Sequence, residues 1–311
     1  MEYLVAAYTD TGLIKETNQD SICVRRALLP GYGEMILAVV CDGMGGLKKG
    51  EVASAATVNA FGYWFDNNLD RFPSLCSNDF SQIRNQWSEL VEGLHYSLLN
   101  YSEKNSIHLG TTVATLFTYA DRYLVMNIGD SRIYERKKQL RQLTQDQSLV
   151  AREIAAGRIT EDESRHHPQR NILLQCIGAG DKITPDFTEG QVQSDALYLL
   201  CTDGLNHELS PKDLYDRFQP ILLNSKEAMT EALRNATETC KRCGETDNIT
   251  AILVKTRESR YVNSKNTVKS RLRRLFRPSI DKTIPTAELL ETAQIIHTQE
   301  VIGQNGRQQT R

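Results

Sequence analysis

The sequence lacks several features that would assign it to common protein classes. No apolar run reaches the roughly 18–20 residues that cross a bilayer. The N-terminal stretch MEYLVAAYTD has an acid where a signal peptide carries positive charge. A net basic field is missing too, because 37 Lys and Arg residues stand against 39 Asp and Glu residues, for a formal charge of −2. Nucleic-acid binding through such a field is therefore excluded.

Disulfide frameworks and nucleotide-binding loops are also absent. The seven cysteines are thinly spread, and their odd number indicates reduced thiols and a cytosolic protein. No Gly-Lys-Ser or Gly-Lys-Thr forms a Walker loop, and Gly43–Gly46 lacks the G-x-G-x-x-G spacing. Cys240-x-x-Cys243 could be redox-active, but it has no second metal-binding pair and no thioredoxin-like context. We expect two spectator thiols there.

Charge is unevenly distributed along the chain, and this predicts a domain boundary. Residues 256–278 contain eight basic side chains and one acid, Glu258, and the remaining chain is rich in Ser, Thr, Asn and Gln. Such a segment buries too little apolar surface to offset its ordering entropy. We therefore expect a folded domain over 1–255 and a basic linker with a disordered tail over 256–311. The stretch Lys269–Arg277 could dock on an anionic membrane, but a solvated linker is expected.

Short apolar or β-branched runs bounded by turn residues predict strands at Leu4–Thr9, Ser21–Ala27, Met35–Cys41, Val113–Tyr119, Tyr123–Ile128, Arg132–Arg136, Ala196–Cys201 and Ile249–Lys255. Helical spacing predicts helices at Glu51–Asn67, Phe80–Tyr101, Ser148–Ala156 and Lys226–Cys240. The turns Ala120–Arg122 and Gly129–Ser131 are short enough to close hairpins, which favours antiparallel pairing. Strands and long helices without a strict βαβ rhythm indicate an α+β fold, with helices on the outer faces of antiparallel sheets.

Five aspartates lie at the ends of predicted strands. They are Asp20, Asp42, Asp130, Asp203 and Asp247. A single such residue has an ordinary interpretation as a turn or helix cap. Asp42 and Asp203, however, both follow a buried apolar run and both precede glycine. If the strand ends converge, like charges repel, and hard divalent cations with oxygen ligands are the natural occupants. Gly43 lets its own carbonyl approach a metal closely.

Eight short stretches between about residues 3 and 255 follow one another in a familiar order. They are Thr9-Asp10-Thr11-Gly12 through Asn18-Gln19-Asp20, Cys41-Asp42-Gly43-Met44-Gly45-Gly46, Gly110-Thr111-Thr112, Asn127-Ile128-Gly129-Asp130-Ser131-Arg132, Leu143-Thr144-Gln145-Asp146-Gln147-Ser148, Gln175-Cys176-Ile177-Gly178, Leu200-Cys201-Thr202-Asp203-Gly204-Leu205 and Thr246-Asp247-Asn248-Ile249-Thr250. In their order and residue identities these stretches resemble the motifs of the metal-dependent Ser/Thr protein phosphatases of type 2C (the PPM family), in their compact bacterial form.

The resemblance implies a sandwich of two antiparallel β-sheets, flanked by helices on both outer faces, with two Mn²⁺ or Mg²⁺ ions at one edge. Carried over by position, Asp42 would bridge both ions and the carbonyl of Gly43 would bind the second. Asp203 and Asp247 would hold the first ion. A hydroxide between the two ions would then attack phosphorus in line, without a covalent phosphoenzyme.

The remaining family positions are matched less completely. Asp20 would orient a metal-bound water, and Asp130 with Asp203 would offer a third, weaker ion site. Lys15 stands where many members have an Arg that clamps the phosphate, so it keeps the charge but loses bidentate geometry. Gln19 replaces a Glu that contacts the second metal in some members.

Protonation of the leaving group is a further departure from the family. Met44 occupies the place of a His proposed as general acid in eukaryotic members, so this protonation would fall to a metal-bound water. His207, four residues after Asp203, is a second candidate or an outer-shell group, but a surface loop histidine is the expected interpretation.

The activity that the resemblance implies is that of a protein-serine/threonine phosphatase, which opposes a Ser/Thr kinase in bacterial signalling. Its partners would be phosphorylated proteins, and we expect a cytoplasmic monomer. Residues Leu149–Gly178 align with a mobile flap beside the active site, although a basic helix–loop face is the alternative. That segment carries Arg152, Arg158, His166, His167 and Arg170. A pseudophosphatase that binds a partner also stays open, but a binding module has no need to gather repelling carboxylates.

Overall fold

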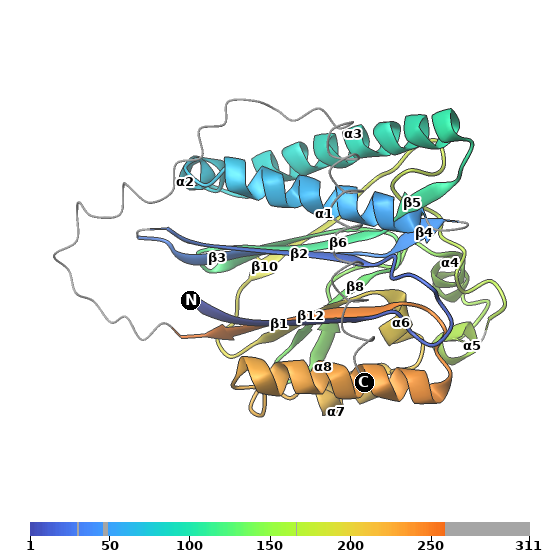
Figure 1. Ribbon diagram of the computed structural model, residues 1–311. Helices are drawn as coiled ribbons and strands as arrows, with labels where there is room; N and C mark the ends of the chain where they lie inside the picture. The colour runs from blue at the N-terminus through green and yellow to red at the C-terminus, as the bar shows by residue number, and fades with distance from the viewer. Residues whose placement is uncertain (30, 46–48, 166, 259–311) are drawn as a thin grey trace, which may run out of the picture.

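The computed structural model describes residues 1–29, 31–45, 49–165 and 167–258, which form four layers. Two five-stranded antiparallel sheets lie face to face, with helices on both outer faces (Figure 1). The first sheet has the order β1 (Glu2–Asp10), β12 (Ile249–Arg257), β11 (Leu197–Cys201), β8 (Arg132–Arg136) and β9 (Leu140–Gln142). The second has the order β10 (Asp186–Gln191), β7 (Arg122–Ile128), β6 (Val113–Tyr119), β3 (Gly33–Cys41) and β2 (Ser21–Leu29). The predicted α+β sandwich is confirmed.

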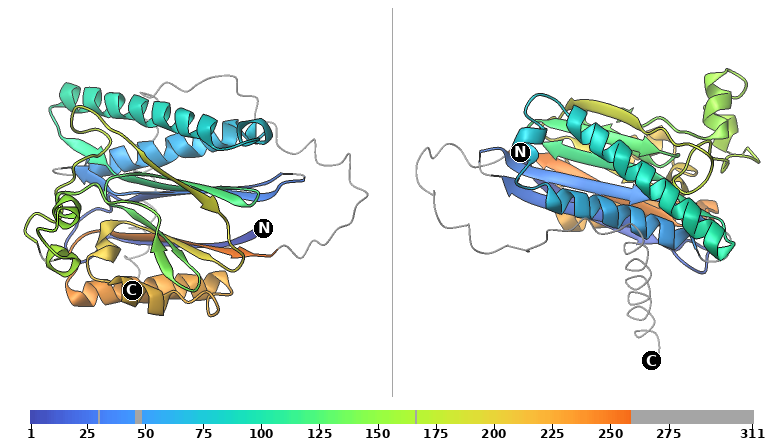
Figure 2. Two further views of the ribbon diagram at one scale, coloured as in Figure 1. Left: turned by 180° about the vertical axis from the view of Figure 1, so that it is seen from behind. Right: turned by 90° about the horizontal axis from the view of Figure 1, so that it is seen from above.

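Helices cover the sandwich on both sides (Figures 1 and 2). The second sheet is covered by α1 (Gly50–Asn67) and α3 (Ser81–Asn105), which the short α2 (Phe72–Leu75) connects. The first sheet is covered by α7 (Pro211–Arg217) and α8 (Lys226–Cys243). At one end of the sandwich lie α4 (Leu149–Ala155), α5 (Glu161–Arg165), α6 (Asp203–Asn206) and the small pair β4 (Gly43–Gly45) and β5 (Leu109–Thr111).

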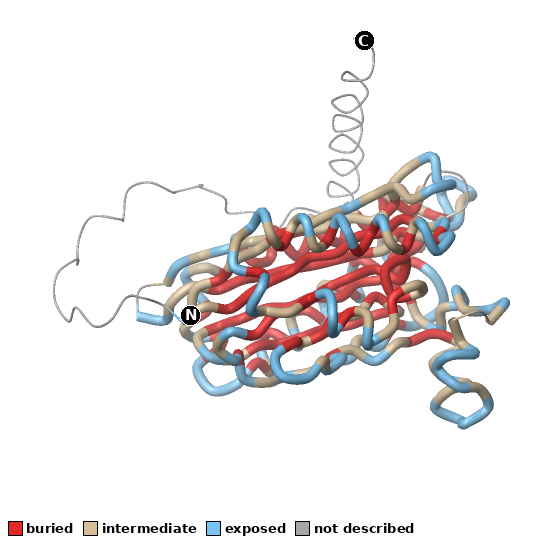
Figure 3. Tube along the Cα trace, turned by 90° about the horizontal axis from the view of Figure 1, so that it is seen from below, coloured by how far each residue is buried: buried red, intermediate tan, exposed pale blue. Residues whose placement is uncertain are grey.

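Two inner strands of the sandwich, β3 and β11, are buried on both faces. In β3, odd-numbered residues from Met35 to Cys41 pack toward α1 and α3, while even-numbered residues from Ile36 to Val40 pack against the other sheet. Strand β11 divides its side chains in the same way between α8 and the opposite sheet. Each fully buried aliphatic side chain stabilises the fold by about 1.5–3 kcal/mol. The ends of both strands are therefore firmly placed, and Figure 3 shows the buried residues concentrated along the strands.

One of the two predicted hairpins is wrong. The hairpin across Ala120–Arg122 is confirmed, because β6 and β7 pair antiparallel. Across Gly129–Ser131, however, the chain leaves the second sheet after β7 and enters the first sheet as β8. Gly129 has a φ of 102°, and a Cβ there would lie 2.6 Å from Thr112 Cγ2, so the chain turns sharply at this point. The turn places Asp130 at the edge between the two sheets.

The C-terminal strand runs slightly beyond the predicted domain boundary. Strand β12 continues past 255, and Arg257 pairs with Glu2. The predicted linker and tail span residues 256–311. From residue 259 onward, including Lys269–Arg277, they lie outside the residues that the structure describes. All seven cysteines lie within the described residues as free thiols, with Cys240 buried and Cys243 exposed. None of the helices in the described ranges has the length and apolar character that crossing a bilayer requires.

Candidate metal centre

The five aspartates lie at one end of the sandwich, where strand ends from both sheets meet. Asp20 precedes β2, Asp42 follows β3 and Asp130 follows β7, so three belong to the second sheet. Asp203 follows β11 and opens α6, and Asp247 precedes β12, so two belong to the first sheet. The structure therefore brings together residues that lie more than 200 positions apart in the sequence.

Asp42 lies at the centre of this carboxylate group. Burial raises the pKa of Asp42 far above its ordinary value, and the charges of Asp203, Asp20, Asp247 and Asp130 raise it further. Burial is also the largest cause that raises the pKa of Asp20 to about 7 and that of Asp130 to about 8. The pKa of Asp203 is raised for the same reason, although His207 opposes the shift. Gathering these carboxylates in one place is costly without a positive charge among them.

The donor set fits hard divalent cations. Asp20 Oδ1 and Asp203 Oδ1 are buried and have no hydrogen-bond partner among the described residues. A buried carboxylate oxygen without a partner destabilises the protein, and Mn²⁺ or Mg²⁺ would satisfy it. As they stand, no three His, Cys, Asp or Glu side chains within the described ranges are arranged to hold a metal ion. Because the carboxylates repel one another, we expect a cation to draw them closer.

Hydrogen bonds orient the carboxylate of Asp20. Thr202 Oγ1 donates to Asp20 Oδ2 at 2.9 Å. The backbone N–H of Asp20 donates to Asn18 Oδ1 at 3.1 Å, which fixes the loop before β2. Oδ1 is therefore the oxygen that Asp20 presents to a ligand.

The backbone of Asp42 is held by the two threonines of the Gly-Thr-Thr motif. Asp42 N–H donates to Thr112 Oγ1 at 2.9 Å, and Asp42 O accepts from Thr111 Oγ1 at 2.8 Å. Thr111 also exchanges two backbone hydrogen bonds of 2.9 Å with Ile177. The end of the Leu149–Gly178 segment is thus tied to the strand pair that positions Asp42.

Gly43 has no room for a side chain. A Cβ there would lie 2.3 Å from the carbonyl oxygen of Gly50 and 2.4 Å from that of Gln19. Because backbone atoms do not yield easily, we expect Gly43→Ala to lower the free energy of unfolding by about 1–3 kcal/mol in denaturant titrations. The control Gly93→Ala on α3 meets nothing within 4 Å. It should stabilise the helix by up to about 1 kcal/mol, so equal effects of the two changes would contradict the prediction.

Lys15 lies on the loop between β1 and β2. Asn248 Nδ2 donates to the carbonyl oxygens of Thr11 at 2.9 Å and Thr17 at 3.2 Å, so this loop is held at both ends. The Lys15 ammonium forms an ion pair with Asp247 Oδ1 at 2.7 Å. Burial would lower the pKa of Lys15, but the pairing with Asp247 and the charges of Asp42 and Asp203 together raise it. The structure therefore places Lys15 on a predicted metal ligand.

Gln19 and Met44, the two other departures from the family pattern, stand next to Asp20 and Gly43 in the sequence. Gln19 is buried, and its Nε2 donates to Glu51 Oε2 at 3.5 Å, so it contacts the first turn of α1. Met44 pairs with Gly110 between β4 and β5.

The expectation that His207 lies in a surface loop is wrong. It caps the end of α6, and only 12% of its side chain is exposed. Nε2 lies 3.4 Å from Asp203 Oδ2, and Nδ1 lies 3.0 Å from Glu245 Oε2. Burial would lower the pKa of His207, but the charges of Asp203 and Glu245 raise it. Glu245, which the sequence analysis missed, stands two residues before Asp247, and this spacing was the only hint of it.

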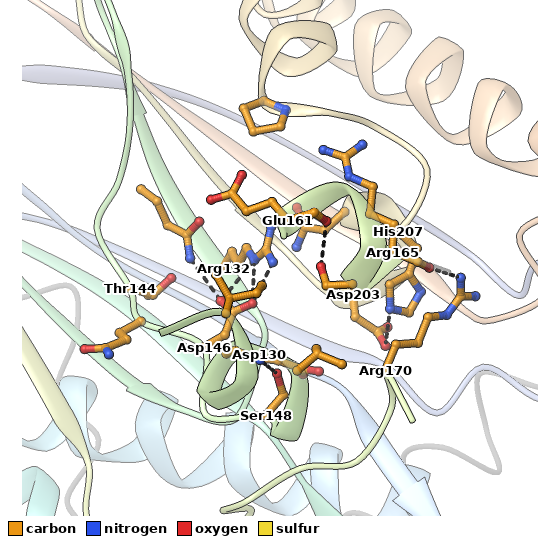
Figure 4. A pocket seen from close by; sticks show the side chains of 18 of the residues that line it. Asp130, Arg132, Thr144, Asp146, Ser148, Glu161, Arg165, Arg170, Asp203 and His207 are labelled. Atoms are coloured by element: carbon orange, nitrogen blue, oxygen red, sulfur yellow. Dashed lines mark hydrogen bonds and ion pairs between the residues drawn. The ribbon is translucent and has the colours of Figure 1, made fainter. Parts of the chain in front are cut away.

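A pocket of about 320 Å³ adjoins the carboxylates (Figure 4). Asp130 and Asp203 line it together with residues of α4, α5 and the following loop, among them Arg165 and Arg170, which lie beside His207. Neither α4 nor α5 contains a buried residue, and both project from the sandwich (Figure 2). This placement favours the flap interpretation over that of an ordinary basic face. His166 lies outside the described residues.

Comparisons with known proteins agree with the geometry. The family model described as protein phosphatase 2C matches residues 15–238. Protein phosphatase PhpP of Streptococcus pneumoniae is 31% identical over 259 residues, which cover 82% of this chain and 98% of PhpP. The S. agalactiae serine/threonine phosphatase structure has a TM-score of 0.69 at 26% identity, covering 82% of this chain and 100% of its own.

A further related structure contains metal. It is the catalytic domain of the serine/threonine protein phosphatase PstP in complex with two manganese ions, with a TM-score of 0.65 at 25% identity, covering 81% of this chain and 97% of its own. The matched residues include most of the domain described above and four of the five aspartates. The chain therefore belongs to the protein phosphatase 2C (PPM) family of Ser/Thr protein phosphatases, in its bacterial form.

Proposed function

We propose that this phosphatase hydrolyses phosphoserine and phosphothreonine in proteins with two Mn²⁺ or Mg²⁺ ions. The observation that carries the proposal is the gathering of five aspartates from both sheets, two of which present buried oxygens without partners among the described residues. The two manganese ions bound by the related PstP domain support it.

The candidate ligands can be divided between two ions. Asp42 would bridge them, the Gly43 carbonyl would bind the second, and Asp203 and Asp247 would hold the first. Asp130 with Asp203 would supply a third, weaker site. When bound, such ions lower the pKa of water and neutralise charge on the phosphate.

The protein's own groups supply orientation. Because Thr202 occupies Asp20 Oδ2, only Oδ1 is free to accept a proton from the attacking water. A carboxylate fixed in this way has less freedom to lose when the substrate binds. Met44 carries no proton to donate, so the leaving alkoxide takes its proton from water.

Lys15 is proposed to contact the substrate phosphate. We expect Lys15→Gln to raise KM about 10–150-fold, because a hydrogen bond to a charged group contributes about 1.5–3 kcal/mol. The affinity for Mn²⁺ should stay equal or increase, since Asp247 loses a competing ammonium. Lys15→Arg, with its bidentate fork, should lower KM.

Steady-state kinetics at saturating Mn²⁺ measure these effects. Lys212→Gln on α7, whose side chain is 85% exposed, is the control that should change nothing. An unchanged KM in Lys15→Gln would restrict Lys15 to its ion pair with Asp247.

The substrates are proposed to be cytoplasmic phosphoproteins, phosphorylated by an opposing Ser/Thr kinase. The seven free thiols suit a reducing compartment. The pocket beside Asp203, with Arg165 and Arg170 on its flap side, offers positive charge to a phosphorylated segment. We also propose that the phosphatase works as a monomer.

The direct test is phosphate release from a phosphothreonine peptide and from p-nitrophenyl phosphate by the full chain. Release should require Mn²⁺ or Mg²⁺, stop with a chelator and return when excess metal is added. Binding of the phosphopeptide without release of phosphate would instead establish the pseudophosphatase alternative.

A further inference from the structure

Glu245 is a buried carboxylate whose contacts all lead to the candidate metal centre. Its side chain is 1% exposed. Oε1 accepts the backbone N–H groups of Thr246 at 2.7 Å and Asp247 at 2.9 Å. Oε2 lies 3.0 Å from His207 Nδ1. One side chain therefore contacts both the loop that carries Asp247 and the imidazole beside Asp203.

His207 connects Glu245 to Asp203, the other proposed ligand of the first ion. Its Nε2 lies 3.4 Å from Asp203 Oδ2, while its Nδ1 contacts Glu245. An imidazole with both ring nitrogens engaged cannot rotate freely, so it holds the carboxylate that it contacts. Asp203 Oδ1 is left for a ligand, because it has no partner among the described residues.

Ending α8 does not require the Glu245 side chain. Gly244 adopts a left-handed conformation with a φ of 100°, and the backbone N–H of Glu245 donates to the carbonyl oxygen of Cys240 at 3.1 Å. Backbone groups alone thus terminate the helix. A buried carboxylate is costly, and an apolar residue would fill the same space more cheaply. Helix termination therefore does not explain why position 245 carries a buried negative charge.

We propose that Glu245 is a positioning residue that preorganises Asp203, through His207, and Asp247, through its backbone N–H, for the first cation. The inference rests on the proposed function. Outer-shell groups of this kind orient the ligands of a metal, and their loss lowers metal affinity more than it alters the ligands' chemistry.

The test is Glu245→Gln in the full chain, with direct Mn²⁺ binding measured by titration calorimetry. Glutamine keeps Oε1 for the two backbone N–H groups but replaces Oε2 with an NH₂ group that cannot accept from His207. We expect Mn²⁺ to bind about 10–100-fold more weakly, with kcat at saturating Mn²⁺ within about threefold of the wild type. The matched control is Glu238→Gln on α8, whose side chain is 49% exposed and which should bind Mn²⁺ normally.

A second variant separates positioning from general stability. His207→Asn breaks the same chain of contacts, so Glu245→Gln and His207→Asn should be strongly non-additive in Mn²⁺ affinity when combined. A merely structural role would lower the melting temperature of the chelated protein and leave Mn²⁺ affinity unchanged, and that result overturns the proposal. Additive losses overturn it too. If the wild type itself binds no Mn²⁺ and releases no phosphate, the proposed function fails first.

Discussion

Asp42→Asn should lower kcat by at least about 100-fold, because a group that holds charge at the reacting centre contributes about 3 kcal/mol or more to the transition state. The same substitution should stabilise the chelated protein. Asp42 is buried among Asp203, Asp20, Asp247 and Asp130, and asparagine removes one repelling charge. The melting temperature of the chelated Asp42→Asn variant should rise by about 2–4 °C for each kcal/mol of repulsion removed.

Opposite changes in activity and stability distinguish this variant from one that merely unfolds. Phosphate release in Mn²⁺ and a thermal melt in chelator measure the two effects. The control Asp66→Asn removes a 53% exposed carboxylate that pairs with Arg25 at 3.2 Å, and it should alter neither. A wild-type rate in Asp42→Asn would refute the assignment of Asp42.

In chelator, the protein should become less stable as the pH rises from about 5 to about 8. The folded protein holds Asp20 with a pKa of about 7 and Asp130 with a pKa of about 8, whereas both ordinary values are 3.8. Over this window the folded state keeps protons that the unfolded chain has already released, so the free energy of unfolding falls and then levels off. The raised pKa of His207 acts in the same direction.

Saturating Mn²⁺ should oppose this loss of stability. Bound cations neutralise the carboxylates in place of the protons. Each site occupied at a free Mn²⁺ concentration of 100 times its Kd stabilises the fold by about 2.7 kcal/mol. The gain in melting temperature on adding Mn²⁺ should therefore be larger at pH 8 than at pH 5. A chelated protein with a constant melting temperature across this range would contradict the prediction, and Asp20→Asn should flatten the slope.

The parts of the fold that the sequence predicts best are strands buried on both faces. Val113–Tyr119 has the same bounds in the structure, since a continuous apolar or β-branched run between turns leaves few alternatives. The more polar strand Arg132–Arg136 also has the predicted bounds, with Ile133 and Tyr134 buried on opposite faces. The polar edge strand Asp186–Gln191 was missed. Its sequence shows no alternation, and it forms because β7 offers a free edge.

Individual aspartates were predictable from their place at the ends of strands, but their surroundings were not. The pairing of Lys15 with Asp247 joins residues that lie far apart in the sequence, and no spacing rule links them. His207 and Glu245 meet only because α6 and the end of α8 pack against the same strand ends. Contacts of this kind come from tertiary packing, which local periodicity does not encode.

The division of the aspartates between the two sheets has a consequence for the protein's synthesis. Asp20, Asp42 and Asp130 extend from one sheet, whereas Asp203 and Asp247 extend from the other, and β12 joins its sheet by pairing with β1. A growing chain that still lacks β12 has no strand to link β1 to β11 and none to anchor Asp247. On the proposed assignment, the nascent enzyme is inactive until β12, the last strand among the described residues, has left the ribosome and paired with β1.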